Sequence, residues 1–169
     1  MTAIYNYDRI RNDYMTPPEV YKPILEKIGK RKFDLDVCCS KKNIPAKKHF
    51  IDGEMDGLNE AWCKINWMNP PFTTCEHWVR KAVEEQLKGN TTFSILPVRT
   101  ESLFWRECIF LNGKPINPNV DITFLIKNKK EGVTFINPDT GDYVRKDNGE
   151  KGLFKNALAL VIFKGVKNG

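Results

Sequence analysis

The segment from Lys64 to Phe72 reads KINWMNPPF, and it predicts a short strand that ends in an asparagine, two prolines and a phenylalanine. Two consecutive prolines fix two φ angles and remove two backbone donors. The carbonyl groups around them are therefore held rigid and point outward without competing amides. Open α/β sheets bind their ligands at the carboxyl ends of strands, so we expect a ligand beside Asn69. A simple Pro-Pro turn leaving the strand is the alternative.

The tetrapeptide Asn69-Pro70-Pro71-Phe72 suits a planar ring that carries an exocyclic amine. The side-chain oxygen of Asn69 and the carbonyl of Pro70 can accept the two hydrogens of such an amine. Pro71 keeps this turn rigid, and the flat face of Phe72 can stack on the ring. We therefore predict that these residues form the catalytic part of a site.

Hydrophobic periodicity predicts alternating helices and strands. Thr16 is the expected N-cap of a first helix, which starts at Pro17-Pro18 and ends at Gly29. Residues 40–61 contain no long apolar run and predict loop, turn and a short strand. The pattern predicts an α/β three-layer sandwich of the Rossmann-like type, with a mixed sheet and a C-terminal antiparallel hairpin. Strands are expected at 33–37, 64–68, 91–97, 122–126, 133–136 and 157–163, and further helices at 74–88 and 101–110, the first of these with Trp78, Val79, Ala82, Val83 and Leu87 inward.

Composition limits the class of protein. The chain has 169 residues, of which 41% are hydrophobic and 28% are charged, as in one ordinary globular domain. We expect an N-terminal arm over 1–13 and a single domain over 14–169, without a separate target-recognition domain. The net charge of +6 favours a polyanionic partner. No signal peptide or membrane-length apolar run is present, which predicts a cytoplasmic protein, and the five cysteines lack metal-ligand spacing, so no metal is expected.

Four further segments accompany the tetrapeptide in a fixed order. They are Tyr14–Val20, Phe33–Cys39, Asp56–Leu58 followed by Trp62, and Leu96–Thr100 followed by Trp105. With the Asn-Pro-Pro-Phe motif, they resemble the amino-group methyltransferases that use S-adenosylmethionine, and more narrowly the phage-encoded DNA adenine methyltransferase family. The resemblance covers residues 14–110 well and the remainder loosely.

The resemblance implies a binding site for S-adenosylmethionine. Asp36 would meet the methionine ammonium, with Cys38 against it. Thr16 would bind the carboxylate and Asp56 the adenine amine, while Asn69 would lie beside both cofactor and target. Each residue also has a plainer interpretation, namely a turn cap for Asp36, a helix cap for Thr16 and an ordinary turn for Asp56-Gly57. No glycine-rich loop follows the first strand, and neither Asp52 nor Glu54 can be assigned to the ribose.

The same resemblance implies methylation of the 6-amino group of adenine in double-stranded DNA, with the base flipped out of the duplex and stacked on Phe72. The expected DNA-binding residues are Arg99, Thr100, Lys127, Lys129 and Lys130. With no separate recognition domain, the tail, the N-terminal arm or a second copy in a homodimer must read the DNA sequence. A solvated turn is the alternative for the lysine run.

Other functions remain open at this point. The same chemistry would methylate the cytosine 4-amino group or a protein glutamine, although the glutamine-modifying relatives carry Asn-Pro-Pro-Tyr after a glycine-rich loop. A nucleic-acid-binding module without activity is a different class. It is suggested by the tail, where Lys127–Lys130 and Leu153–Asn156 depart from the motifs of phage relatives.

Overall fold

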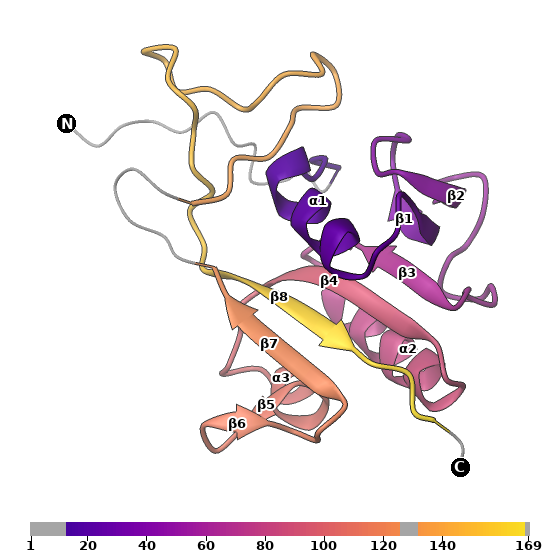
Figure 1. Cartoon of the computed structure of the whole chain (residues 1–169). Coiled ribbons are helices and arrows are strands. Elements are labelled where there is room, and N and C mark those ends of the chain that lie inside the picture. Colours follow the sequence, from indigo (N-terminus) through magenta and orange to yellow (C-terminus); the bar gives the residue numbers. More distant parts are fainter. Residues whose placement is uncertain (1–12, 126–131, 168–169) are drawn as a thin grey trace.

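The computed structural model describes residues 13–125 and 132–167. Its strands form a six-stranded sheet in the order β2-β1-β3-β4-β8-β7, and a separate two-stranded hairpin pairs β5 with β6. Figure 1 shows helix α1 on one face of the large sheet and helices α2 and α3 on the other. The elements are α1 (Pro18–Lys27), β1 (Phe33–Cys39), β2 (Ala46–Ile51), β3 (Ile65–Met68), α2 (Cys75–Leu87), β4 (Thr91–Pro97), α3 (Leu103–Cys108), β5 (Phe110–Leu111), β6 (Lys114–Pro115), β7 (Val120–Phe124) and β8 (Leu158–Phe163).

Strand directions confirm the predicted α/β class and mixed sheet. Strands β2, β1, β3 and β4 are parallel, whereas β8 runs antiparallel to both β4 and β7. The pair β7 and β8 is the expected antiparallel pair at the C-terminal end. From β1 the chain adds β2 on one side and β3 on the other. The carboxyl ends of β1 and β3 therefore flank a topological switch point, where such sheets bind ligands.

A hydrophobic core fills each face of the sheet. On one face, Tyr21 and Leu25 of α1 pack with Phe33 and Trp67. On the other face, Val79 and Ala82 of α2 belong to a second cluster, together with Leu35, Trp105 and Val161. Burying each large apolar side chain contributes about 1.5–3 kcal/mol, so both faces hold the strands in place.

Two details of the predicted helices are wrong. The N-cap of α1 is Pro17, which makes no side-chain cap, and not Thr16. Leu87, expected inward, is 64% exposed. The buried positions of α2 run along Cys75, Val79, Ala82 and then Glu85 and Gln86, and Leu87 lies off this stripe. The polar contacts of Glu85 and Gln86 therefore decide which side of the last turn faces inward.

The tail also differs from expectation. The strand predicted at 122–126 lies two residues earlier, and residues 133–136 form no strand, because Ile136 makes only isolated bridges to Met15 and Tyr143. The backbone groups of Met15 and Ile136 exchange two hydrogen bonds of 2.9 Å. The Tyr143 hydroxyl donates to Glu19 of α1 at 2.8 Å. In Figure 1 the segment between β7 and β8 extends beyond α1, and these contacts tie its described part to the first residues of the domain.

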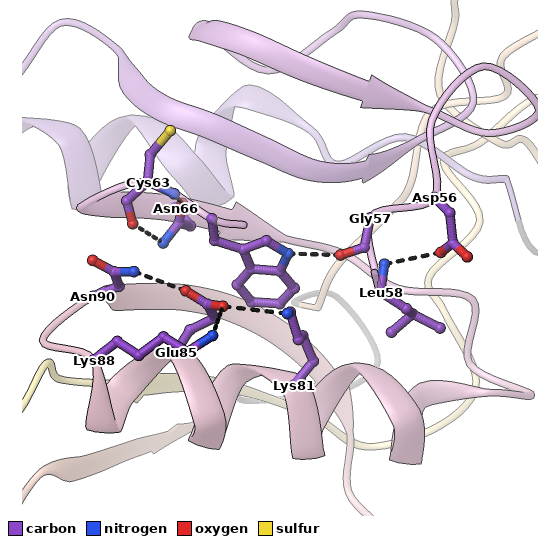
Figure 2. A network of polar contacts seen from close by, with 10 residues as sticks. Asp56, Gly57, Leu58, Cys63, Asn66, Lys81, Glu85, Lys88 and Asn90 are labelled. Carbon is purple, nitrogen blue, oxygen red and sulfur yellow. Dashed lines mark hydrogen bonds and ion pairs between the residues drawn. The ribbon is translucent and has the colours of Figure 1, made fainter. Parts of the chain in front are cut away.

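A buried polar network ends α2, and Figure 2 shows it around Glu85. Glu85 is 1% exposed and accepts hydrogen bonds from Lys88 at 2.9 Å and Asn90 at 2.8 Å, with Lys81 at 3.3 Å. Burial acts to raise the pKa of Glu85, but the hydrogen bonds from Lys88, Asn90 and Lys81 outweigh it and lower the pKa. The buried carboxylate therefore stays charged and holds the turn into β4.

Candidate functional site

A cavity of about 450 Å³ opens at the carboxyl ends of β1 and β3. Its volume lies in the range of small-molecule sites. The walls come from the segment before α1, from the ends of β1 and β2, from the turn before β3 and from the start of α2. The predicted residues that line it are Thr16, Asp36, Cys38, Asp56, Asn69 and Pro71.

Asp36 is the most unusual group of the cavity. It is 1% exposed, and its Oδ1 atom has no hydrogen-bond partner. Burial raises the pKa of Asp36 to about 8, although hydrogen bonds from the backbone of Cys38 and the thiol of Cys39 act to lower it. A buried carboxyl oxygen without a partner is costly unless a ligand supplies one. This site therefore suits a ligand with a cationic group.

Thr16 and Trp67 bring two further unpartnered polar atoms to the same walls. The Oγ1 of Thr16 and the Nε1 of Trp67 are buried without a hydrogen-bond partner, and both residues line the cavity. Each unsatisfied buried group costs about 1–3 kcal/mol. With Asp36, they place one acceptor for a cation and two possible donors for an anion in one cavity, which fits the charged end of an amino acid.

Asn69 follows β3 and has a defined orientation. Its side-chain nitrogen donates to the backbone carbonyl of Tyr14 at 3.0 Å. This bond identifies the other end of the amide, Oδ1, as the atom left to accept hydrogen bonds. The side chain thus presents an acceptor next to the cavity that Asp36 lines.

The thiol of Cys38 contacts the backbone of Asn69. The backbone N–H of Asn69 donates to this sulfur. Burial raises the pKa of Cys38 well above its usual range, and the neighbouring Asp36 raises it further. The thiol stays protonated at neutral pH, so Cys38 offers the cavity a small apolar contact and no charge.

The other motif residues lie beside the cavity. Pro70 is buried, and neither it nor Phe72 is among the described residues that line the cavity. The Phe72 ring packs edge-on against Phe154, with ring centroids 5.6 Å apart, and against Phe135 at 6.2 Å. Phe135 and Phe154 of the segment between β7 and β8 therefore pack directly on the motif.

Asp56 lines the cavity and also forms the turn that was the alternative interpretation of Asp56-Gly57. Its Oδ1 accepts the N–H of Leu58 at 3.0 Å, as Figure 2 shows, and its Oδ2 accepts Asn59 at 2.6 Å. Gly57 leaves no room for a side chain, because a Cβ there would collide with the carbonyl of Val37. The indole of Trp62 donates to Gly57 at 2.7 Å. The turn is thus pressed against the end of β1.

Several cavity residues were not assigned from the sequence. Asp52 and Glu54 follow the end of β2, and both line the cavity. An acidic residue directly after the second strand was the available signal. Trp78 of α2 also lines the cavity, although its helical spacing indicated a core residue, and the structure gives it both roles.

The expected DNA-binding residues lie elsewhere. Arg99 is partly exposed and Thr100 is exposed directly after β4, outside the cavity lining. Lys127, Lys129 and Lys130 lie outside the described residues. Within residues 13–125 and 132–167, no three His, Cys, Asp or Glu side chains gather as a metal site. No helix in the described part of the chain is long and apolar enough to cross a membrane.

Comparison with known proteins gives a family. The model of the family described as DNA N-6-adenine-methyltransferase (Dam) matches residues 6–167. The DNA N-6-adenine-methyltransferase of Escherichia phage T1 is 28% identical over 147 residues, which cover 83% of this chain and 60% of that protein. The protein of the same name from Haemophilus phage HP1 (strain HP1c1) is 29% identical over 118 residues, covering 69% of this chain and 62% of that protein. The chain thus spans about three-fifths of these relatives, and no solved structure matches it.

Proposed function

This chain belongs to the DNA N-6-adenine-methyltransferase (Dam) family, and on that premise we propose that it transfers a methyl group from S-adenosylmethionine to the 6-amino group of adenine in double-stranded DNA. One observation carries the proposal. The Asn69 amide, held by the Tyr14 carbonyl at 3.0 Å, presents its oxygen beside a cavity with an unpartnered buried carboxyl oxygen. An amine acceptor and a cation site thus adjoin one another.

The residues of the cavity fit the cofactor. Asp36 would take the methionine ammonium, Thr16 the carboxylate, and Cys38 would contact the chain between them. Asp56 would accept the adenine amine with the lone pairs that its turn leaves free, and Asp52 or Glu54 would face the ribose hydroxyls. When bound, S-adenosylmethionine supplies an electrophilic methyl group on a sulfonium.

Asn69 and Pro70 would act on the target amine. An adenine amine is a poor nucleophile because its lone pair is delocalised into the ring. Hydrogen bonds from this amine to Asn69 Oδ1 and the Pro70 carbonyl favour a more tetrahedral nitrogen, which localises the lone pair. The bond to Tyr14 prevents the amide from rotating, so the acceptor is preorganised and needs no rearrangement during the reaction.

The base must leave the duplex to reach these groups. Phe72 is half-buried, and Phe135 and Phe154 support its edges. This support would keep the ring in place when an extruded adenine stacks on its remaining surface. Pro71, which lines the cavity, would keep the motif rigid.

The net charge of +6 supports DNA as the substrate. The proposed place of action is the cytoplasm, which is that of the host if the protein is phage-encoded. Arg99 and Thr100, at the carboxyl end of β4, would contact the phosphate backbone. The lysines Lys127, Lys129 and Lys130 would extend this contact. A homodimer would double the surface that reads the target sequence.

The proposal is tested with tritiated S-adenosylmethionine and plasmid DNA. Label should enter the DNA with the native protein and should enter at least about a hundredfold more slowly with Asn69→Ala. Asn117→Ala is the matched control, because Asn117 is exposed outside the cavity lining. DNA binding without any transfer by the native protein would favour the inactive binding module, and equal transfer by both variants would remove Asn69 from the mechanism.

A further inference from the structure

Trp67 combines complete burial, a place in the cavity lining and an unused donor. It is 0% exposed, and its ring packs on Phe33 with centroids 5.5 Å apart. Its indole N–H has no hydrogen-bond partner, yet the residue lines the cavity. Trp67 lies in the strand before the motif, and neither its packing nor the motif accounts for this donor.

Trp67 of β3 is the cross-strand neighbour of Asp36 in β1. The two residues face each other across the pair β1 and β3. Neighbouring strands lie about 4.8 Å apart, and residues opposite one another point to the same face of the sheet. Asp36 Oδ1 is likewise unpartnered, so two cross-strand neighbours that both line the cavity carry an unpartnered acceptor and an unpartnered donor.

We propose that the indole N–H of Trp67 is a cofactor-binding group that donates a hydrogen bond to the methionine carboxylate of S-adenosylmethionine. This assignment rests on the proposed function. An indole can only donate, so Trp67 cannot hold the ammonium, which belongs to Asp36. In an amino acid the carboxylate and the ammonium are attached to the same carbon. A donor beside the ammonium site therefore meets the carboxylate, which Thr16 approaches from the segment before α1.

Trp105 supplies a matched control within the same chain. It is also 0% exposed, and its indole N–H is also without a partner, but it does not line the cavity. Trp67→Phe and Trp105→Phe therefore delete the same atoms from equally buried positions. Any loss that comes from packing alone should appear in both variants.

The experiment measures cofactor affinity by calorimetry for the native protein and both variants. Trp67→Phe should weaken S-adenosylmethionine binding by about tenfold to a hundredfold, the range for a hydrogen bond to a charged group. Trp105→Phe should bind as the native protein does. Decarboxylated S-adenosylmethionine keeps the amine but lacks the carboxylate, and its affinity should be the same for all three proteins.

A second measurement follows Trp67 in the native protein and so does not depend on the folding of Trp67→Phe. The indole N–H signals of ¹⁵N-tryptophan-labelled protein are assigned by substituting the other three tryptophans. The Trp67 signal should move downfield with S-adenosylmethionine and stay in place with the decarboxylated form, and the Trp105 signal should stay in place with both.

The outcomes separate this inference from the proposed function. A native protein that binds no S-adenosylmethionine would overturn both. Native binding with equal losses in the two variants, or an equal loss for the decarboxylated ligand in Trp67→Phe, would overturn only the role of Trp67. A Trp67 signal that does not shift when S-adenosylmethionine is added would likewise overturn only the role of Trp67.

Discussion

At the level of single residues, the proposed catalysis depends on which end of the Asn69 amide faces the target amine. The Tyr14 carbonyl accepts a hydrogen bond of 3.0 Å from the side-chain nitrogen of Asn69. Asn69→Ala should lower the transfer rate by about 10²–10³-fold, the cost of removing one preorganised acceptor or donor, with cofactor affinity within about tenfold of native. Asn69→Asp should also lose activity, because it sets an oxygen against the Tyr14 carbonyl. Single-turnover rates and calorimetry measure both effects, and a fully active Asn69→Asp would show that the Tyr14 contact is irrelevant.

Because the pKa of Asp36 is raised, we expect the free energy of unfolding of the protein without cofactor to depend on pH. This pKa is about 8 in the folded state because of burial, but about 4 when unfolded. The folded state therefore holds a proton that the unfolded state releases, so this group's contribution to stability is complete below pH 4. It is lost as pH rises towards 8. Asp36→Asn should flatten this part of the curve in denaturant unfolding at several pH values. Parallel curves for the two proteins would mean that Asp36 has an ordinary pKa.

Substitutions of Phe72 test whether the target base stacks on its ring. Phe72→Ala should lose roughly 1–3 kcal/mol of transition-state stabilisation, whereas Phe72→Trp should keep most of it. The loss should shrink when the target adenine lies opposite a mismatch, since less unstacking is then required. Values of kcat/KM on paired and mismatched duplexes provide the measurement. Equal losses on both duplexes would assign Phe72 to the aromatic cluster with Phe135 and Phe154 alone.

For helices and strands, hydrophobic periodicity and turn residues predicted the bounds correctly where local sequence determines the structure. The strand before Asn69, the strand 91–97 and the extent of α2 follow the predictions closely. The failures have tertiary causes. Leu87 faces solvent because Glu85 turns inward. Residues 133–136 join no sheet, and Ile136 makes only isolated bridges, one of them to the distant Met15. No local pattern reports such partners.

The network at the end of α2 gives a matched pair of substitutions. Glu85 is 1% exposed with three partners, and its neighbour Glu84 is exposed. Glu85→Ala should destabilise the fold by about 1–3 kcal/mol or more, because it leaves buried donors unpaired. Glu84→Ala should stay within about 0.5 kcal/mol of native. Urea unfolding midpoints measure both, and similar midpoints would show that the network adds nothing to stability.

At the scale of the whole molecule, the candidate site assembles residues that are distant in the sequence. Thr16, Asp36, Asp56 and Asn69 were named from motifs and meet at one cavity. The missing partners of Thr16, Asp36 and Trp67 could not be read from the sequence, because an unsatisfied atom is defined only by everything packed around it. The contact of the tail with Phe72 was hidden for the same reason.

Methylation of the 6-amino group of adenine in DNA is the activity that we propose for this chain. The most direct measurement is mass spectrometry of nucleosides from duplex DNA incubated with the native protein and S-(trideuteromethyl)-adenosylmethionine. We expect deuterated N6-methyl-2′-deoxyadenosine, with about 10²–10³-fold less formed in the same time by Asn69→Ala. Deuterated N4-methyl-2′-deoxycytidine in its place, or unmodified DNA from a protein that binds the cofactor, would contradict it.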